Sequence, residues 1–382
     1  MALTDYPPLM NTSERIEMDT KAVKTGYLPE LDGIRAIAIL MVVAVHAHIP
    51  FAPGGFIGVD LFFVLSGYLI TSILLKEHNK NGTIDFKRFY WRRGLRLLPA
   101  LTVLLILFIA FGLLFQLDMQ ILIRDVTIVF FYAASWSRAL YNIPPDWLGH
   151  TWSLSIEEQL YFLWPLILIK LNRFSIKSVL ISLSSFAFTV SIYRYVLLSN
   201  NVSTDRIYFG FDTRIDTILF GCILAYLLSC DNSVIKFVSR KIILNMTTIA
   251  SIAFLLFILT CFNGKMMFFY SYGLMLTGVS SAVIILYVLV NSNGLLSSLL
   301  RFPFLVYTGK ISYGLYIWHW PIFNYLHSHT QLQTGTKAVI GIIASYAVSA
   351  LSYYLVERPL LKYKDVFIGK ESGERYGVEP VS

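Results

Sequence analysis

The chain is organised as long apolar runs separated by short polar segments. Ten of these runs are long enough to cross a bilayer as helices, which takes about 20 predominantly apolar residues each. The pattern therefore predicts an all-α, polytopic transmembrane helical bundle of about ten spans. The predicted spans are 30–48, 57–75, 97–117, 154–171, 176–197, 213–230, 242–262, 268–291, 310–327 and 337–356.

A further apolar run at 125–136 is too short for an ordinary span. Its length favours a re-entrant or interfacial segment. The polar segments 1–29 and 358–382 are predicted to be cytosolic tails, which leaves 30–357 as the transmembrane domain.

Composition and charge support this topology. The chain is 56% hydrophobic and 14% charged, whereas soluble domains carry about 25% charged residues. Most of the 31 Lys and Arg fall in segments that are cytosolic when both termini lie inside, and the few basic residues assigned to outer loops include Arg194. The positive-inside rule thus accounts for the net charge of +8, and no nucleic-acid partner is implied.

The three cysteines, Cys222, Cys230 and Cys261, have no metal-site spacing. We expect buried free thiols and no metal site.

Two ionisable residues lie in the first span. Arg35 and His46 are eleven residues apart, which is almost three helical turns, so they share one face about 16 Å apart along the axis. Two alternatives involve no function: Arg35 could extend its side chain to the membrane surface, and His46 could be a buried histidine whose hydrogen bonds are all made within the bundle. Because ionisable groups in spans usually face a cavity or a partner, we predict a functional site. Arg35 would lie near the cytosolic end, and His46 toward the outer end could act as a general base.

Two flanking stretches add candidates. Arg93 and Arg96 are three apart at a helix start, so they share a face and could grip a phosphate, although topology and lipid headgroups could also explain them. Ser155 and Glu158 fit a capping box. Glu157 has no such role, and a carboxylate entering a span is a candidate site residue.

The remaining membrane ionisable residues are distributed over three further spans. Arg214 and Asp216 could form a self-contained ion pair or a sugar-binding site. His319 falls near the middle of its span. Asp60 follows three glycines, Gly54, Gly55 and Gly58, which imply close helix approach.

Glu357 closes the last predicted span at its inner end. It could contribute to a site or form a plain surface pair with Arg358.

Seven stretches, in this order, resemble acyltransferase family 3 of bacterial membrane proteins. They are LDGIRAIAILMVVAVHA, GGFIGVDLFFVLSGYLIT, RFYWRRGLRLLPA, HTWSLSIEEQLYFLWP, YFGFDTRIDTILFG, GKISYGLYIWHWP and YLVERP. The resemblance implies a multi-pass protein of the bacterial cytoplasmic (inner) membrane. It also implies acyl transfer, commonly of acetyl from acetyl-CoA, to hydroxyls of surface glycans such as lipopolysaccharide or exopolysaccharide, with no permanently bound cofactor.

The resemblance also assigns roles by position. The family's pattern of Arg, ten residues and His falls on Arg35 and His46, its paired arginines on Arg93 and Arg96, and its Glu-x-Pro motif on Glu357. The expected site follows: His46, Glu157 and Asp60 for catalysis; Arg35, Arg93, Arg96 and Glu357 for acyl-CoA; Arg214, Asp216 and His319 for the acceptor. The partners would be acyl-CoA, a glycan or lipid-linked glycan, and membrane lipid. A transporter of a small anion or lipid-linked sugar is the alternative, since the same polar residues would suit a substrate path.

Overall fold

The computed structural model describes residues 27–145, 147–229, 238–262 and 266–364, and within these ranges it is helical and contains no strand. Most of the two predicted tails lies outside the described residues. The helices, with short 3₁₀ or π turns labelled η, are α2 (Pro29–His46), η1 (Gly55–Ile57), α3 (Gly58–Asn81), α4 (Phe86–Leu114), α5 (Met119–Phe130), α6 (Ala134–Tyr141), η2 (Gly149–Thr151), α7 (Trp152–Leu171), α8 (Ile176–Ser199), α9 (Thr204–Phe209), α10 (Ile215–Leu228), α12 (Lys241–Cys261), η3 (Phe269–Gly273), α13 (Leu274–Val290), α14 (Leu295–Leu300), α15 (Pro303–Lys310), α16 (Ser312–His329), α17 (Thr334–Ser352), η4 (Tyr353–Glu357), α18 (Arg358–Leu361) and η5 (Lys362–Lys364).

Every predicted span corresponds to a helix, but the helices differ in length and polarity. Among the described residues, six are long and apolar enough to cross a membrane: α3, α4, α8, α12, α13 with its η3 turn, and α17 with the turns after it. The helices α2, α7, α10 and α16, which belong to the other four predicted spans, are shorter or carry more polar residues. The protein is therefore a multi-pass helical membrane protein in which the polar helices sit among the apolar ones.

The short run at 125–136 forms parts of two helices, α5 and α6. They meet at an angle of 118°, and if this bent pair counts as one span the total is seven. Such a geometry fits the predicted re-entrant segment and equally fits a broken span. Beyond the bend, the η2 turn is buried and leads directly into α7.

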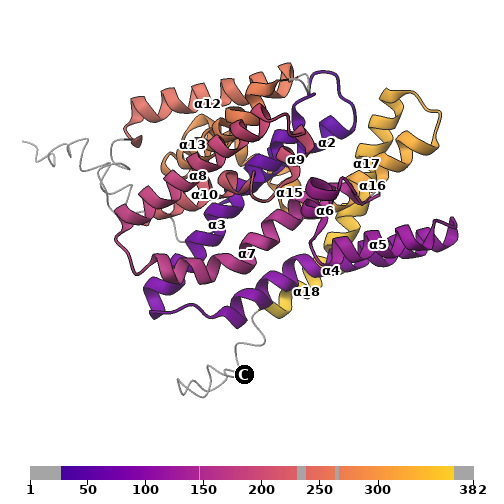
Figure 1. Ribbon diagram of the computed structural model, residues 1–382, viewed down its shortest axis with the longest axis horizontal. Helices are drawn as coiled ribbons and strands as arrows, with labels where there is room; N and C mark the ends of the chain where they lie inside the picture. The colour runs from indigo at the N-terminus through magenta and orange to yellow at the C-terminus, as the bar shows by residue number, and fades with distance from the viewer. Residues whose placement is uncertain (1–26, 146, 230–237, 263–265, 365–382) are drawn as a thin grey trace, which may run out of the picture.

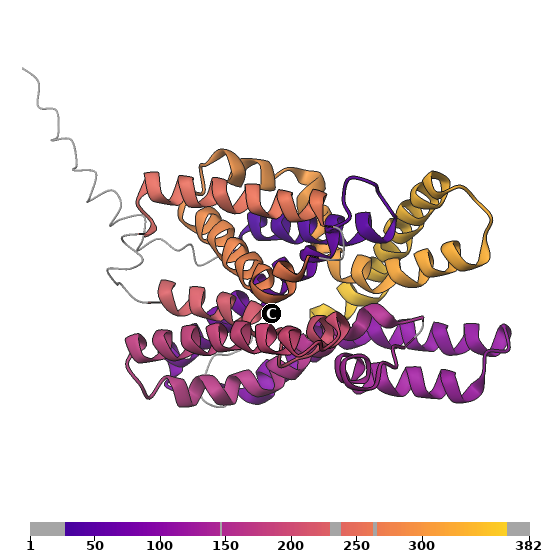
Figure 2. The same ribbon diagram turned by 45° about the horizontal axis from the view of Figure 1, so that its top comes forward.

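The long helices lie side by side as a bundle, and the pairs α4–α5 and α16–α17 extend from one end of it (Figure 1). Turning the molecule shows the pair α16–α17 on one side and the pair α4–α5 on the other at that end (Figure 2), where the rings of Phe111 in α4 and Tyr325 in α16 lie 6.5 Å apart. α3 is central, with 72% of its apolar stretch buried, whereas only 22% of the corresponding stretch of α17 is buried. The less buried helices therefore expose more of their apolar side chains at the surface of the bundle than α3 does.

Glycines set how closely the inner helices approach. A Cβ atom on Gly58 would collide with the carbonyl oxygen of Ala38 in α2, and one on Gly55 with that of Met41. On the other side of α3, a Cβ on Gly221 of α10 would collide with the carbonyl oxygen of Val64. The close approach predicted for the glycines before Asp60 is confirmed, and it clamps α3 between α2 and α10.

Candidate active site

A wide cavity of about 550 Å³ opens between α2, α4, α15 and the turns after α17. Its lining is strongly basic, with three acidic residues (Asp32, Glu77 and Glu357) against seven basic ones: Arg35, Arg88, Arg92, Arg93, Arg96, Lys310 and Lys364. The volume lies within the range of about 300–1,000 Å³ typical of small-molecule sites. A cavity of this size and charge suits a polyanionic ligand.

A narrow cavity of about 120 Å³ continues inward from the wide one. The two share Arg35, Arg93 and Arg96 in their linings. Beyond these arginines the narrow cavity is mostly apolar and reaches Glu157 and Tyr316. The predicted anion-binding arginines therefore stand at the junction between a basic entrance and an apolar neck.

The two arginines of α4 differ in their partners. Arg93 donates from Nε and Nη2 to Oε1 of Glu158, at 3.3 and 3.1 Å, and its guanidinium stacks over the Tyr161 ring at 3.5 Å. Arg96 lines both cavities and its side chain is exposed. Arg93 and Arg96 are therefore not equally available to bind a phosphate together, as was predicted, because the guanidinium of Arg93 is already bonded to Glu158.

The expected capping box is wrong. α7 begins at Trp152, four residues earlier than a Ser155 cap would require, so Ser155 lies inside the helix and donates to the carbonyl of Thr151 at 3.1 Å. This register leaves Glu158 free to reach Arg93 and places Glu157 in the lining of the narrow cavity.

Tyr316 connects the narrow cavity to a cluster of histidines. Its hydroxyl donates to the backbone carbonyl of His150 at 2.8 Å and accepts from Ser153 at 2.5 Å. The ring of Tyr316 lies 5.6 Å from that of His319 and 5.5 Å from that of His150, centroid to centroid. Sequence reasoning missed Tyr316 and Ser153, because neither is ionised in the way that makes a residue conspicuous in a span.

His46 and His319 face one another across the α2–α16 contact. Nε2 of His319 lies 3.1 Å from Nδ1 of His46, and the His46 ring also packs edge-on against Trp320. His319 is fully buried, whereas His46 is half-buried. Arg35 and His46 lie toward opposite ends of α2. Arg35 lines both cavities, whereas His46 lines neither and instead meets His319.

The sequence that forms this site matches a known protein family. A family model described as an acyltransferase domain matches residues 28–354, which is most of the chain. The chain belongs to acyltransferase family 3. No solved structure matches it.

The curated relatives of this family member are O-acetyltransferases. The chain is 33% identical over 352 residues to the peptidoglycan O-acetyltransferase OatA of Listeria monocytogenes, covering 88% of this chain and 56% of that protein. It is 36% identical to a protein named as a putative O-acetyltransferase of Staphylococcus aureus, covering 90% and 59%, and 33% identical to the O-acetyltransferase OatA of that species, covering 94% and 62%. The chain therefore spans somewhat more than half the length of these relatives.

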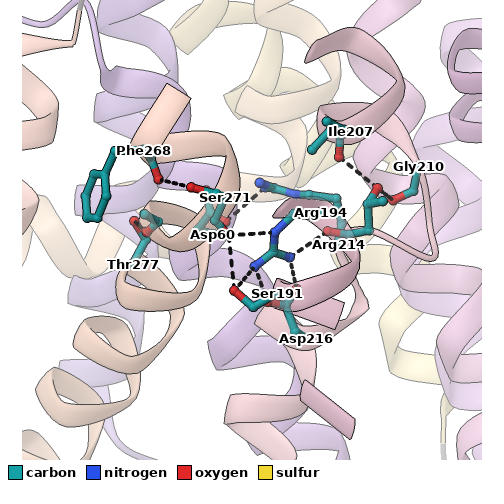
Figure 3. A network of polar contacts seen from close by, with 12 residues as sticks. Asp60, Ser191, Arg194, Ile207, Gly210, Arg214, Asp216, Phe268, Ser271 and Thr277 are labelled. Atoms are coloured by element: carbon teal, nitrogen blue, oxygen red, sulfur yellow. Dashed lines mark hydrogen bonds and ion pairs between the residues drawn. The ribbon is translucent and has the colours of Figure 1, made fainter. Parts of the chain in front are cut away.

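Within this acyltransferase domain, Asp60, Arg214 and Asp216 lie in a buried network of their own (Figure 3). Arg214 pairs with Asp60 at 2.9 Å rather than with Asp216, its near neighbour in sequence. Asp216 instead binds Arg194 through both carboxylate oxygens, each at 2.8 Å. Of the two alternatives for Arg214 and Asp216, the self-contained ion pair is wrong, because the two side chains bind partners on different helices.

Arg194 was assigned to an outer loop, and this assignment is wrong. It lies inside α8, fully buried, and its guanidinium also donates to the backbone carbonyls of Thr213 and Ser271 and to the hydroxyl of Ser191. All of its N–H directions are therefore used. The signal was present in the sequence, since an arginine at 194 falls within the predicted span 176–197.

The two carboxylates that were expected to act in catalysis with His46 have other partners. Asp60 is held by Arg214, and Glu157 lines the narrow cavity among the arginines. The side-chain partner of the His46 ring is instead His319, which had been expected to bind the acceptor.

Glu357 does not form the surface ion pair with Arg358 that was one of its two predicted roles. It is buried in the η4 turn, lines the wide cavity and accepts a hydrogen bond from Ser352 at 3.0 Å. The π-helical turn, wider than an α-turn, directs this carboxylate inward, while Arg358 lies near the Tyr354 ring.

Proposed function

We propose that this family member is a membrane-bound O-acyltransferase that moves an acyl group, most simply acetyl, from cytosolic acyl-CoA to a hydroxyl of a cell-surface or lipid-linked glycan. The single observation that carries the proposal is the pair of connected cavities. They lead from a basic entrance, past Arg35 and Arg96, to Tyr316 beside the histidines.

The proposed position of acyl-CoA follows from the charge and the volume of the two cavities. The phosphates of acyl-CoA would lie in the wide cavity, where basic residues predominate, and the thin pantetheine arm would enter the narrow cavity. Arg35 stands at the junction, held by Asp32 at 2.6 Å, and could contact the arm or the thioester carbonyl. Family membership supports acyl transfer over the transporter alternative, and release of free CoA thiol separates the two experimentally.

Arg96→Gln should weaken acyl-CoA binding and leave the protein folded. Loss of one charge-assisted phosphate contact costs about 1.5–3 kcal/mol, or roughly 10- to 150-fold in Kd. The measurement is calorimetric titration of the purified protein with acetyl-CoA. Arg173→Gln is the matched control, because it removes the same charge from an exposed residue that lines neither cavity. An unchanged Kd for Arg96→Gln would mean that this arginine does not bind acyl-CoA and only contributes to the positive charge of the cytosolic side.

The chemistry is a direct exchange of thioester for ester. The acceptor hydroxyl oxygen forms a bond to the thioester carbonyl carbon, the carbon–sulfur bond breaks, and CoA thiolate leaves. The hydroxyl proton passes to His46 and is finally returned to the thiolate. A general base is needed because a sugar hydroxyl is a poor nucleophile at neutral pH.

The relatives' names favour peptidoglycan as the first acceptor to test, with lipopolysaccharide O-antigen and exopolysaccharide as further candidates. Protein in lipid nanodiscs would be incubated with acetyl-CoA and isolated glycan strands. Ester-linked acetyl on the glycan and an equal amount of free CoA thiol are expected. Acetylation without thiol release would overturn the acyl-CoA donor, and thiol release without acetylated peptidoglycan would direct the search to the other glycans.

The orientation proposed is ten spans with both termini in the cytosol of a bacterium, in its inner membrane, and 30–357 as the catalytic domain. A cysteine introduced at Asn79 should then react only with a cytosolic label and one at Asn201 only with an external one, since both residues are exposed. The background variant would lack the native cysteines, because Cys261 is exposed. Labelling of both positions from the same side would exclude the ten-span arrangement.

A further inference from the structure

We propose that His319 is a positioning residue that fixes the tautomer and the orientation of His46, so that Nε2 of His46 is the basic nitrogen. The proposal rests on the proposed function, since it assigns the working atom of the base used there. It changes the expected role of His319 from contact with the acceptor to control of a neighbouring imidazole.

The argument begins with the hydrogen bonds of His319 itself. Its Nδ1 lies 3.0 Å from the backbone carbonyl oxygen of Leu315 and 2.7 Å from that of Tyr316. Carbonyl oxygens only accept hydrogen bonds, so Nδ1 must carry the proton. The two carbonyls come from the preceding turn of α16. The helix backbone therefore determines which nitrogen of His319 carries the proton.

The protonation state of Nε2, the other ring nitrogen of His319, follows from the burial of the residue. The residue is fully buried, and a second proton would create an imidazolium there. No carboxylate among the described residues is bonded to this ring, so such a charge would have no counter-ion at a high desolvation cost. His319 is therefore neutral, and its Nε2 is an acceptor.

The proton on His46 is then determined. Nδ1 of His46 lies 3.1 Å from the accepting Nε2 of His319, so Nδ1 of His46 must be the donor. A neutral imidazole carries one proton, which leaves Nε2 of His46 with its lone pair available. This is the atom that would take the hydroxyl proton of the acceptor.

Packing fixes the direction of the His46 ring as well. The ring meets Trp320 at an interplanar angle of 88° with centroids 4.8 Å apart, and His319 at 5.0 Å. The backbone carbonyl of His46 accepts from Nε2 of His327 at 3.0 Å, which holds the last turn of α2 against α16. α16 thus supplies all three contacts of His46: His319 bonds to its ring, Trp320 packs against the ring, and His327 bonds to its backbone carbonyl.

Two substitutions of His319 separate positioning from packing. The amide of glutamine reaches the place of Nε2, so its oxygen can accept from His46, whereas the amide of asparagine reaches only the place of Nδ1. We expect His319→Asn to lower kcat by about 10- to 100-fold with KM for acyl-CoA unchanged, and His319→Gln to restore most of the loss. His329→Gln, an exposed histidine on the same helix, is the matched control. Equal activity of the Asn and Gln variants, high or low, would overturn the proposal.

A double-mutant cycle adds a readout that a structural role would not produce. If His319 acts only through His46, then His319→Asn should cost nothing further in a His46→Gln background, where no basic nitrogen remains. A full additional loss in that background would show that His319 acts independently of His46.

The unmodified protein supplies a test that no folding defect can affect. Solid-state NMR of protein labelled with ¹⁵N-histidine should show two neutral imidazoles that both carry their proton on Nδ1 and are coupled through a nitrogen–nitrogen contact. An Nε2–H tautomer for His319 would refute the assignment. The proposed function fails separately, by the absence of CoA thiol release from the wild-type protein.

Discussion

Replacing His46 by alanine should reduce acyl transfer to the glycan by about 10²- to 10⁴-fold, which is the usual contribution of a general base. Acyl-CoA binding should stay near normal, because His46 lines neither of the two cavities that hold the arginines. The assay is transfer of radiolabelled acetyl to glycan, with Kd for acetyl-CoA measured on the same preparation.

His46→Gln refines this test. Glutamine keeps much of the shape of histidine and some of its hydrogen bonding but has no useful basicity, so it separates proton transfer from packing. We expect it to be as inactive as His46→Ala and to express as well as wild type. Near-normal turnover of His46→Gln would place the base elsewhere, and Glu157 would then be the next residue to test.

Replacing Asp216 by alanine should destabilise the fold by about 3–5 kcal/mol. The reason is that Arg194, fully buried, would lose the carboxylate that faces two of its nitrogens, and breaking a buried ion pair leaves an uncompensated charge. The measurement is the free energy of unfolding in detergent micelles. Arg206→Ala breaks the partly exposed pair with Asp212 and should cost no more than about 1 kcal/mol.

A double replacement tests the physical reason. Arg194→Met together with Asp216→Leu removes both charges and should recover much of the stability lost by Asp216→Ala. If Asp216→Ala were no more destabilising than Arg206→Ala, the network would have to be read as a binding site and not as a scaffold.

The sequence predicted the helices well, and it predicted which faces carry chemistry. Apolar length alone located a helix in each of the ten predicted spans, and helical spacing placed Arg35 and His46 toward opposite ends of the first of them. Both are local properties, set by 1.5 Å of rise and 3.6 residues per turn.

Partners across helices could not be predicted, because periodicity gives the face of a helix but not the helix opposite it. Asp60 meets Arg214, 154 positions away, and His46 meets His319, 273 positions away. The nearest candidates along the chain, Asp216 for Arg214 and a capping role for Glu158, were the wrong ones for the same reason. One composition-based assignment also failed: Arg194 was counted with the loops although a fully satisfied guanidinium is stable inside a bundle.

The narrowing from about 550 Å³ to about 120 Å³ has a consequence for the cell's energy supply. In the proposed function the protein connects a cytosolic thioester with an external acceptor, and it must do so without letting ions leak across the bilayer. The constriction is too small for a nucleotide and is lined mainly by apolar side chains around fixed positive charges, which repel protons and other cations. In the proposed orientation, with the wide cavity facing the cytosol, the narrow cavity would let an acyl group pass to the outer side and would still block the flow of ions.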